Sequence, residues 1–243
     1  MSGSNVTART SELSGSPNRP VGARSNGLPA VRYWMTAAFV VSLVLAAIVL
    51  GMAGAGEHGT ALALRVTARW CFLLFWPAYA GSALARFCGP RFAVLTRQGR
   101  AFGLAFAAAL SVHVGLVLWL MAVAADQRTP MLLFWAGVAC TYALALLSLP
   151  RLRDWLGPRA WHIACEGAMQ YIALVFAVDF IVEPLQANGP GKYPLTYLPF
   201  VVMLVGGALL RLAAQIWRPG PAGRARADGT ISEAVPQPHW HSR

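Results

Sequence analysis

Six long apolar stretches limit what this chain can fold into. Lipid offers no partner for backbone N–H and C=O groups, so a segment that crosses a bilayer must satisfy them internally, and a spanning helix needs about 20 mainly apolar residues. Stretches of that length run over residues 33–53, 61–87, 101–125, 131–149, 161–182 and 195–217. The pattern therefore predicts an all-α, polytopic membrane bundle of six transmembrane helices.

The composition supports the same fold class and excludes a water-soluble enzyme. Apolar residues make up 57% of the chain and charged residues only 12%, with a mean hydropathy of +0.52. Residues 1–31 and 218–243 are rich in Ser, Gly, Pro and Arg and lack the apolar content to fold. We expect them to be disordered cytoplasmic tails that flank a six-helix membrane domain over residues 32–217.

The first apolar stretch resembles a signal peptide because small residues follow it around residues 53–56. Its apolar core is too long for a signal peptide, and more than thirty residues precede it. We interpret it as an uncleaved membrane anchor.

The distribution of Lys and Arg predicts the orientation of the spans, because these residues are retained on the cytoplasmic side. With both termini cytoplasmic, sixteen of the 20 basic residues fall on the inner side. The other four, Arg65, Arg69, Arg128 and Lys192, lie on or near the outer side. We expect a multi-pass protein of the cell inner membrane. The inner-side residues are Arg9, Arg19, Arg24, Arg32, Arg86, Arg91, Arg97, Arg100, Arg151, Arg153, Arg159, Arg211, Arg218, Arg224, Arg226 and Arg243.

The same placement indicates a partner for the strong positive charge. The formal net charge is +11 and the isoelectric point is near 10.5. Nearly all the basic residues are Arg, and they fall in the gaps between apolar stretches. The charge therefore favours a lipid bilayer as partner and not a nucleic acid.

The four cysteines carry no recognisable chemistry. Cys71, Cys88, Cys140 and Cys165 stand singly in or beside apolar stretches, without metal-ligand or disulfide-scaffold spacing. We interpret them as small core residues. The chain also lacks a phosphate-binding glycine motif, a zinc-protease motif and a serine-hydrolase motif in a suitable context, so nucleotide-dependent chemistry on this chain is not expected.

Two pairs of opposite charge lie near the predicted outer ends of spans two and five. Arg65 and Arg69 are four residues apart, as are Asp179 and Glu183, so each pair shares a helix face. Matching depth and opposite sign suggest that the pairs meet between helices. One interpretation is an interhelical ion-pair clamp or snorkelling side chains, and the other is binding of an anionic group, such as a haem propionate or a quinone-site oxygen.

His113 lies near the middle of span three with no charged neighbour in sequence. A buried imidazole needs partners for both nitrogens. In one interpretation, a haem iron binds one of the two ring nitrogens. In the other, the ring is hydrogen-bonded across helices, to Tyr142, Thr141 or Gln170. Glu166, on the inner half of span five, is interpreted either as a proton relay or as a protonated Glu that is hydrogen-bonded in place.

Several short segments between residues 64 and 180, within a core of about 62–183, resemble the ferric reductase-like transmembrane family. Arg65-Val-Thr-Ala-Arg-Trp70 opens span two, and Ala83-Leu-Ala-Arg86 ends it. The basic segment Arg97-Gln-Gly-Arg-Ala-Phe-Gly-Leu104 precedes the helix that carries His113, and Leu156-Gly-Pro-Arg-Ala-Trp161 opens span five. The order and spacing of these segments across four helices are similar to those of the family.

This resemblance implies a site for one b-type haem, with His113 as an iron ligand and Arg65 and Arg69 as partners of the propionates. The family places a His four residues after the Trp of span five, where this sequence has Cys165. His162 is a poor substitute, because helix rise places it about 15 Å from His113 in depth. Cys165 and Met169 are the remaining candidates for a second ligand, and Met169 is nearer to His113 in depth.

The function implied by the resemblance is a membrane electron-transfer subunit that passes electrons from a quinone or a partner flavoprotein to an outer-side acceptor. The chain lacks a flavin or nicotinamide domain, so the reductant must come from another protein or the quinone pool. The alternative is a haem-free structural or interaction subunit on the same scaffold. A small transporter is less favoured, because the spans show no internal repeat.

The distribution of basic residues makes the topology testable with reporter fusions. An odd span count, with the termini on opposite sides, would contradict the predicted orientation. We expect a cytoplasmic signal from fusions after Arg24, within 91–100, within 151–159 and after Arg218, and an outer-side signal from fusions near His58, Arg128 and Gly189.

Overall fold

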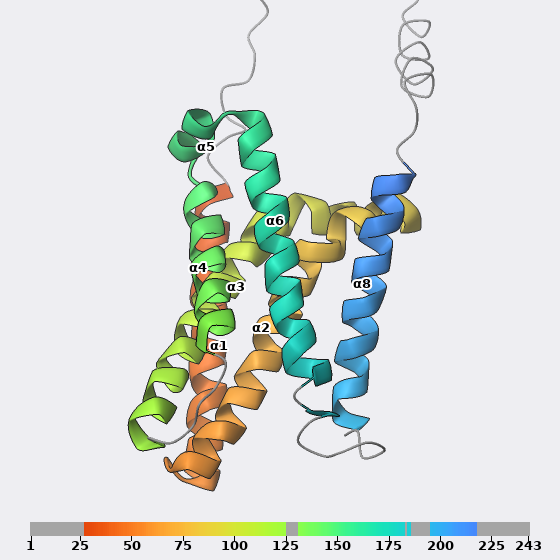
Figure 1. The fold of residues 1–243 in the computed structure, drawn as a ribbon. Helices are drawn as coiled ribbons and strands as arrows, with labels where there is room; N and C mark the ends of the chain where they lie inside the picture. The colour runs from red at the N-terminus through yellow and green to blue at the C-terminus, as the bar shows by residue number, and fades with distance from the viewer. Residues whose placement is uncertain (1–26, 125–130, 183, 186–194, 218–243) are drawn as a thin grey trace, which may run out of the picture.

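The computed structural model describes residues 27–124, 131–182, 184–185 and 195–217, which are almost entirely helical and contain no strand. Figure 1 shows the helices running up and down through one bundle. The helices are α1 (Gly27–Ala53), α2 (Glu57–Cys88), α3 (Ala93–Val123), α4 (Met131–Leu147), α5 (Pro150–Leu156), α6 (Pro158–Ala177) and α8 (Leu198–Ile216), with short turns η2 (Pro90–Phe92), η3 (Val178–Val182) and η4 (Leu195–Tyr197). The expected tails 1–26 and 218–243 lie outside the described residues.

Five helices are long and apolar enough to cross a membrane, so the protein is a multi-pass membrane protein. They are α1, α2, α3, α6 together with η3, and η4 together with α8. The fourth predicted span corresponds to α4, which has 17 residues. At 1.5 Å per residue α4 is about 25 Å long, shorter than the roughly 30 Å hydrocarbon core of a bilayer.

Helices α1, α2, α3 and α6 begin earlier than the apolar pattern predicted. Helix α2 begins at Glu57 instead of residue 61, and α3 begins at Ala93 instead of residue 101. The prediction followed the apolar residues alone, whereas a helix continues into the polar surroundings as long as its backbone bonds are formed. Arg97 and Arg100 are therefore exposed helical residues, not loop residues.

The basic segment between spans four and five contains a short helix, α5, which the apolar pattern did not predict. Pro150 stands at the first turn of α5 and Pro158 at the first turn of α6, where a missing N–H costs no hydrogen bond. Gly157 between them has a φ of 73°, a conformation that glycine adopts without strain. This turn sets the direction of α6 back through the bundle.

Helix α2 is the central element of the bundle. It packs against α1, α3 and α8, while α4 packs against α6 and α3. In Figure 1, α8 lies at one edge of the bundle and α4 near the other, with α6 between them. The starts of α2 and α8 and the end of α6 are at one end of the bundle, called here the α2-start end. The opposite end, with α5, is called the α5 end.

An aromatic cluster fills the space between α2, α6 and α8. The Phe72 ring, fully buried, makes edge-on contacts with Phe176, Phe180 and Phe200 at centroid distances of 5.3, 5.2 and 5.9 Å. Phe75 continues the cluster towards Phe106 on α3. Edge-on ring pairs stabilise a contact beyond the area they bury, so this cluster joins helices that are distant in sequence.

Helix α8 approaches α2 closely at a glycine. The Trp76 indole N–H donates to the Met203 carbonyl at 2.7 Å and lies over Gly207. A Cβ at Gly207 would lie 3.0 Å from Nε1 of Trp76 and 3.4 Å from Cβ of Ala80. The absence of a side chain at Gly207 therefore permits this contact.

We expect Gly207→Val to separate α8 from α2 and to lower the midpoint of thermal unfolding in mild detergent by several degrees, because the indole cannot move without losing its hydrogen bond. Gly206→Val is the matched control, since no atom lies within 4 Å of a Cβ at Gly206. Equal midpoints for the two variants would contradict the packing at Gly207.

Candidate functional site

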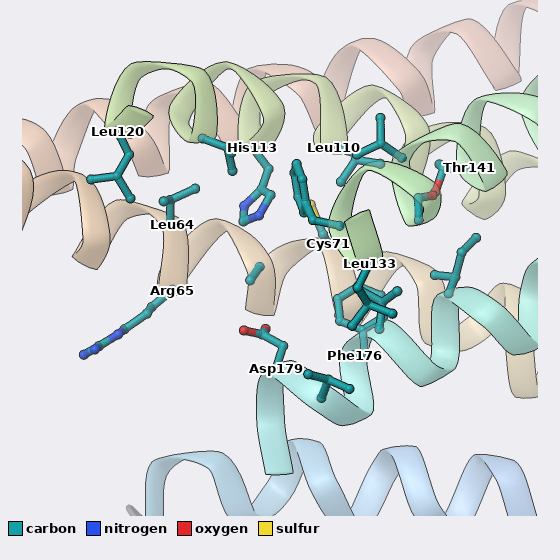
Figure 2. Close-up of a pocket in the computed structure, with 18 of the residues that line it drawn as sticks. Leu64, Arg65, Cys71, Leu110, His113, Leu120, Leu133, Thr141, Phe176 and Asp179 are labelled. Atoms are coloured by element: carbon teal, nitrogen blue, oxygen red, sulfur yellow. The ribbon is translucent and has the colours of Figure 1, made fainter. Parts of the chain in front are cut away.

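A mostly apolar cavity of about 390 Å³ lies between α2, α3, α4 and the α6–η3 segment. Its volume falls in the range of small-molecule and cofactor sites. Leucine, valine, alanine and phenylalanine side chains form most of the wall, with Phe106, Phe134 and Phe176 as the aromatic members. Figure 2 shows that the polar side chains His113, Arg65, Asp179 and Thr141 come from four different elements.

Thr67 on α2 holds the His113 imidazole. Nδ1 of His113 and Oγ1 of Thr67 are 2.9 Å apart. The Thr67 hydroxyl has a single proton, which it donates within α2 to the carbonyls of Ala63 at 2.9 Å and Leu64 at 3.1 Å. With that proton kept within α2, the oxygen accepts a hydrogen bond from His113, and we assign the imidazole proton to Nδ1.

This assignment leaves Nε2 of His113 as an unprotonated nitrogen with a lone pair. Within the described part of the chain, the bond to Thr67 is the only hydrogen bond of the ring. The ring is half-buried, lines the cavity and lies 6.0 Å from the Phe134 ring, centroid to centroid. A histidine whose Nδ1–H is fixed by a neighbouring acceptor is the usual form of a metal-ligating imidazole. Nε2 can bind a metal or accept a proton.

Arg65 and Asp179 line the same cavity near the α2-start end. Arg65 is exposed and Asp179 half-buried. Asp179 belongs to η3, a π-helical turn that continues α6. Single π-helical turns often occur at functional sites, because the wider turn changes the direction of a side chain. Arg65, Asp179 and His113 thus line one cavity, and Figure 2 shows the Arg65 guanidinium directed away from His113.

Arg69 lies apart from this cavity. Its guanidinium stacks 4.7 Å from the centroid of the Tyr197 ring and 5.6 Å from that of Phe200, and it makes a long hydrogen bond of 3.5 Å to Thr196. The side chains of Arg65 and Arg69 therefore have different neighbours, although their spacing suggested a shared role. Glu183, the fourth member of the expected cluster, lies outside the described residues.

Met169 and Cys165 are not among the residues that line the cavity. The cavity wall on α6 begins at Ile172, about two helical turns, or about 10 Å of rise, after Cys165. Met169 packs instead against the aromatic core. The structure does not bring these two candidate ligands together with His113.

The hydrogen-bonding partners predicted for His113 were wrong. Thr141 donates to the Gly137 carbonyl at 2.9 Å, Tyr142 pairs with the Ser111 hydroxyl at 2.9 Å, and Gln170 bonds with Tyr79 and Glu166. Sequence reasoning missed Thr67, although it is a hydroxyl on a neighbouring span. Periodicity does not give the relative rotation of two helices, and that rotation decides which hydroxyl faces His113.

A second polar group lies towards the α5 end. Glu166 forms an ion pair with Arg211 and accepts hydrogen bonds of 3.2 Å from Gln170 and Gln215. Arg211 also donates to the Tyr79 carbonyl at 3.0 Å and stacks over the Tyr79 ring at 4.5 Å. Glu166 is thus hydrogen-bonded in place, as in the second interpretation, although an ion pair with Arg211 is not the partner expected of a protonated carboxyl.

The wall contributed by α6 and η3 offers no usual iron ligand. These segments contribute Ile172, Val175, Phe176 and Val178, apart from Asp179. The usual iron-ligand types in the wall are His113, Cys71 and Met121, which lie on α2 and α3. Among the described residues, no group of three His, Cys, Asp or Glu side chains could hold a metal ion by itself.

Comparisons with protein-family models, with curated proteins and with solved structures find no match to this chain.

We expect Thr67→Val to leave the Nδ1–H of His113 without an acceptor, at a cost of about 1–3 kcal/mol in the free energy of unfolding. Nitrogen NMR of imidazole-labelled protein should show the Nδ1–H tautomer in the wild type and a changed tautomer ratio in Thr67→Val. Thr67→Ser keeps the hydroxyl and should behave as the wild type. A wild-type spectrum of the Nε2–H tautomer would contradict the assignment.

Proposed function

We propose that the protein is a membrane electron-transfer subunit of the ferric reductase-like type that holds one b-type haem through Nε2 of His113. The observation that carries the proposal is the bond between His113 and Thr67. With the imidazole proton assigned to Nδ1, Nε2 of a residue that lines a cavity of cofactor size is left to bind a metal. The order of short motifs shared with that family adds to this support.

In this proposal the polar and aromatic side chains at the cavity have different roles. His113 would hold the iron through Nε2, and Thr67 would fix the tautomer and orientation of its ring. Arg65 pairs with a propionate at the cavity mouth. Phe106, Phe134 and Phe176 cover apolar surface and exclude water, which influences the reduction potential of a bound group. The haem supplies one-electron transfer when it is bound.

The proposed topology has six spans, with α4 as the short fourth span, and both termini in the cytoplasm. The positive charge at the α5 end supports this orientation, because Arg86, Arg91, Arg97, Arg100 and Arg151 belong to elements that meet there. The His113 cavity, nearer the α2-start end, then lies in the outer half of the inner membrane. Electrons would enter from a quinone or a partner flavoprotein and leave towards the outer side.

A specific observation favours one alternative, a haem-free structural or interaction subunit. The wall of the cavity contributed by α6 offers no second nitrogen or sulfur ligand. A protein on the same scaffold that no longer binds haem would have the same helix arrangement and a small apolar cavity. The two functions differ in whether the purified protein carries a chromophore.

We expect protein purified in mild detergent after haem-replete expression to show Soret and alpha bands in a reduced-minus-oxidised spectrum. His113→Ala should reduce the haem content at least tenfold, because the iron loses its protein ligand. His162→Ala is the matched control and should retain haem, since His162 lies in a separate polar cavity near the start of α6.

Two outcomes would contradict the proposal. A haem spectrum that survives His113→Ala would show that this residue is not the ligand. A folded wild type without a chromophore would favour the structural subunit. Circular dichroism and gel filtration of each variant separate loss of haem from loss of fold.

A further inference from the structure

A second, polar cavity of about 220 Å³ lies between α2, α6 and α8, on the side of the aromatic core away from His113. Its wall contains Arg86, Arg211, Glu166, His162, Gln215 and Ser82. Helix α2 ends two residues after Arg86, α8 ends one residue after Gln215, and His162 lies near the start of α6. Figure 1 places these three helix ends at the same end of the bundle.

The position of this cavity matches the headgroup level of a bilayer. Helices α2, α6 and α8 are long and apolar enough to cross a membrane, so their ends at this side reach its polar surface. Trp217, which follows α8, is exposed, and Trp161 at the start of α6 donates to the Leu147 carbonyl. Tryptophan residues favour this depth, where one part of the ring is apolar and the other hydrated.

The charged side chains leave an excess of one positive charge. Glu166 and Arg211 form an ion pair and offset each other. The Arg86 guanidinium donates to the carbonyls of Ala214 and Trp217 at the end of α8, which are dipoles and not full charges. Counted without His162, the side chains of the cavity wall therefore carry a net charge of +1.

Donor groups remain free to meet an anion in this cavity. Within the described part of the chain, neither the Ser82 hydroxyl nor the His162 ring makes a hydrogen bond to another residue. A guanidinium has five N–H donors in a planar fork that matches the oxygens of a phosphate. A hydroxyl, an imidazole and two guanidinium groups are suitable partners for one phosphate.

An apolar surface extends from the cavity along α8 in the direction of the membrane interior. Leu209, Leu212 and Ile216 are exposed, at 60, 53 and 71% of their surface, and their spacing places them on one face of the helix. Each of Arg211 and Gln215 is the direct neighbour of a residue on this face. A molecule with a phosphate in the cavity could therefore lay an alkyl chain on this face.

We infer that this cavity binds the phosphate of an anionic phospholipid. The lipid phosphate contacts Arg86, Ser82 and His162, and an acyl chain follows the apolar face of α8. Basic pockets between helices at the membrane surface are a known way to recognise anionic headgroups. This inference is independent of the haem proposal, because the cavity shares no lining residue with the His113 site.

The test measures lipid binding to delipidated full-length protein in detergent by native mass spectrometry. The probes are dioctanoyl phosphatidylglycerol, dioctanoyl phosphatidylcholine and inorganic phosphate. We expect saturable binding of phosphatidylglycerol, about tenfold tighter than that of phosphatidylcholine. Equal binding of the two lipids would overturn the inference, and a preference for inorganic phosphate over both lipids would assign the cavity to a free anion.

A negative charge introduced at the cavity mouth localises the site. Ser82 is exposed and its hydroxyl makes no hydrogen bond to another described residue, so Ser82→Glu should fold and should weaken phosphatidylglycerol binding about tenfold by repulsion. Ser82→Gln has similar size without the charge and should bind as the wild type. Thr96→Glu adds the same single negative charge at an exposed position of α3 outside the cavity. If Thr96→Glu weakens binding as much as Ser82→Glu, the attraction is diffuse and the site does not exist.

Discussion

In a bilayer no water competes for backbone or side-chain hydrogen bonds, and this constraint governs most polar contacts in the bundle. Hydroxyl groups within the helices bond to the carbonyl one turn earlier, as Thr60, Thr67, Thr141 and Ser148 all do at 2.9–3.0 Å. Such a bond uses the only proton of the hydroxyl. Any further polar group that meets this oxygen must therefore be a donor.

The tautomer of His113 follows directly from this constraint. With its own proton given to a carbonyl of α2, the Thr67 oxygen accepts from the imidazole. We therefore assign the proton of His113, which lines a mainly apolar cavity, to Nδ1. An ordinary intrahelical bond thus gives His113 the chemistry on which the proposed haem site rests. The apolar wall around it strengthens whatever electrostatic or coordinate bond Nε2 makes, because the local dielectric constant is low.

The aromatic cluster around Phe72 lies between two groups of polar residues. On one side, His113 lines the mostly apolar cavity. On the other, the ion pair of Glu166 and Arg211 connects α6 to α8 and borders the polar cavity. Each ion-pairing group has several hydrogen bonds, as expected where partial burial makes an unpaired charge costly.

The apolar stretches alone determined that this is a helical multi-pass membrane protein, because the bilayer fixes the length and composition of a spanning segment. They also placed His113 within a span, where an ionisable side chain is rare. Only the tertiary structure decided that Thr67 faces His113, that Arg69 turns towards Tyr197, and that Cys165 and Met169 do not line the cavity. The physical reason is that hydrophobic periodicity is nearly absent in helices surrounded by lipid on one side and apolar side chains on the other. Their relative rotation is set by packing, through rings such as Phe72 and glycines such as Gly207.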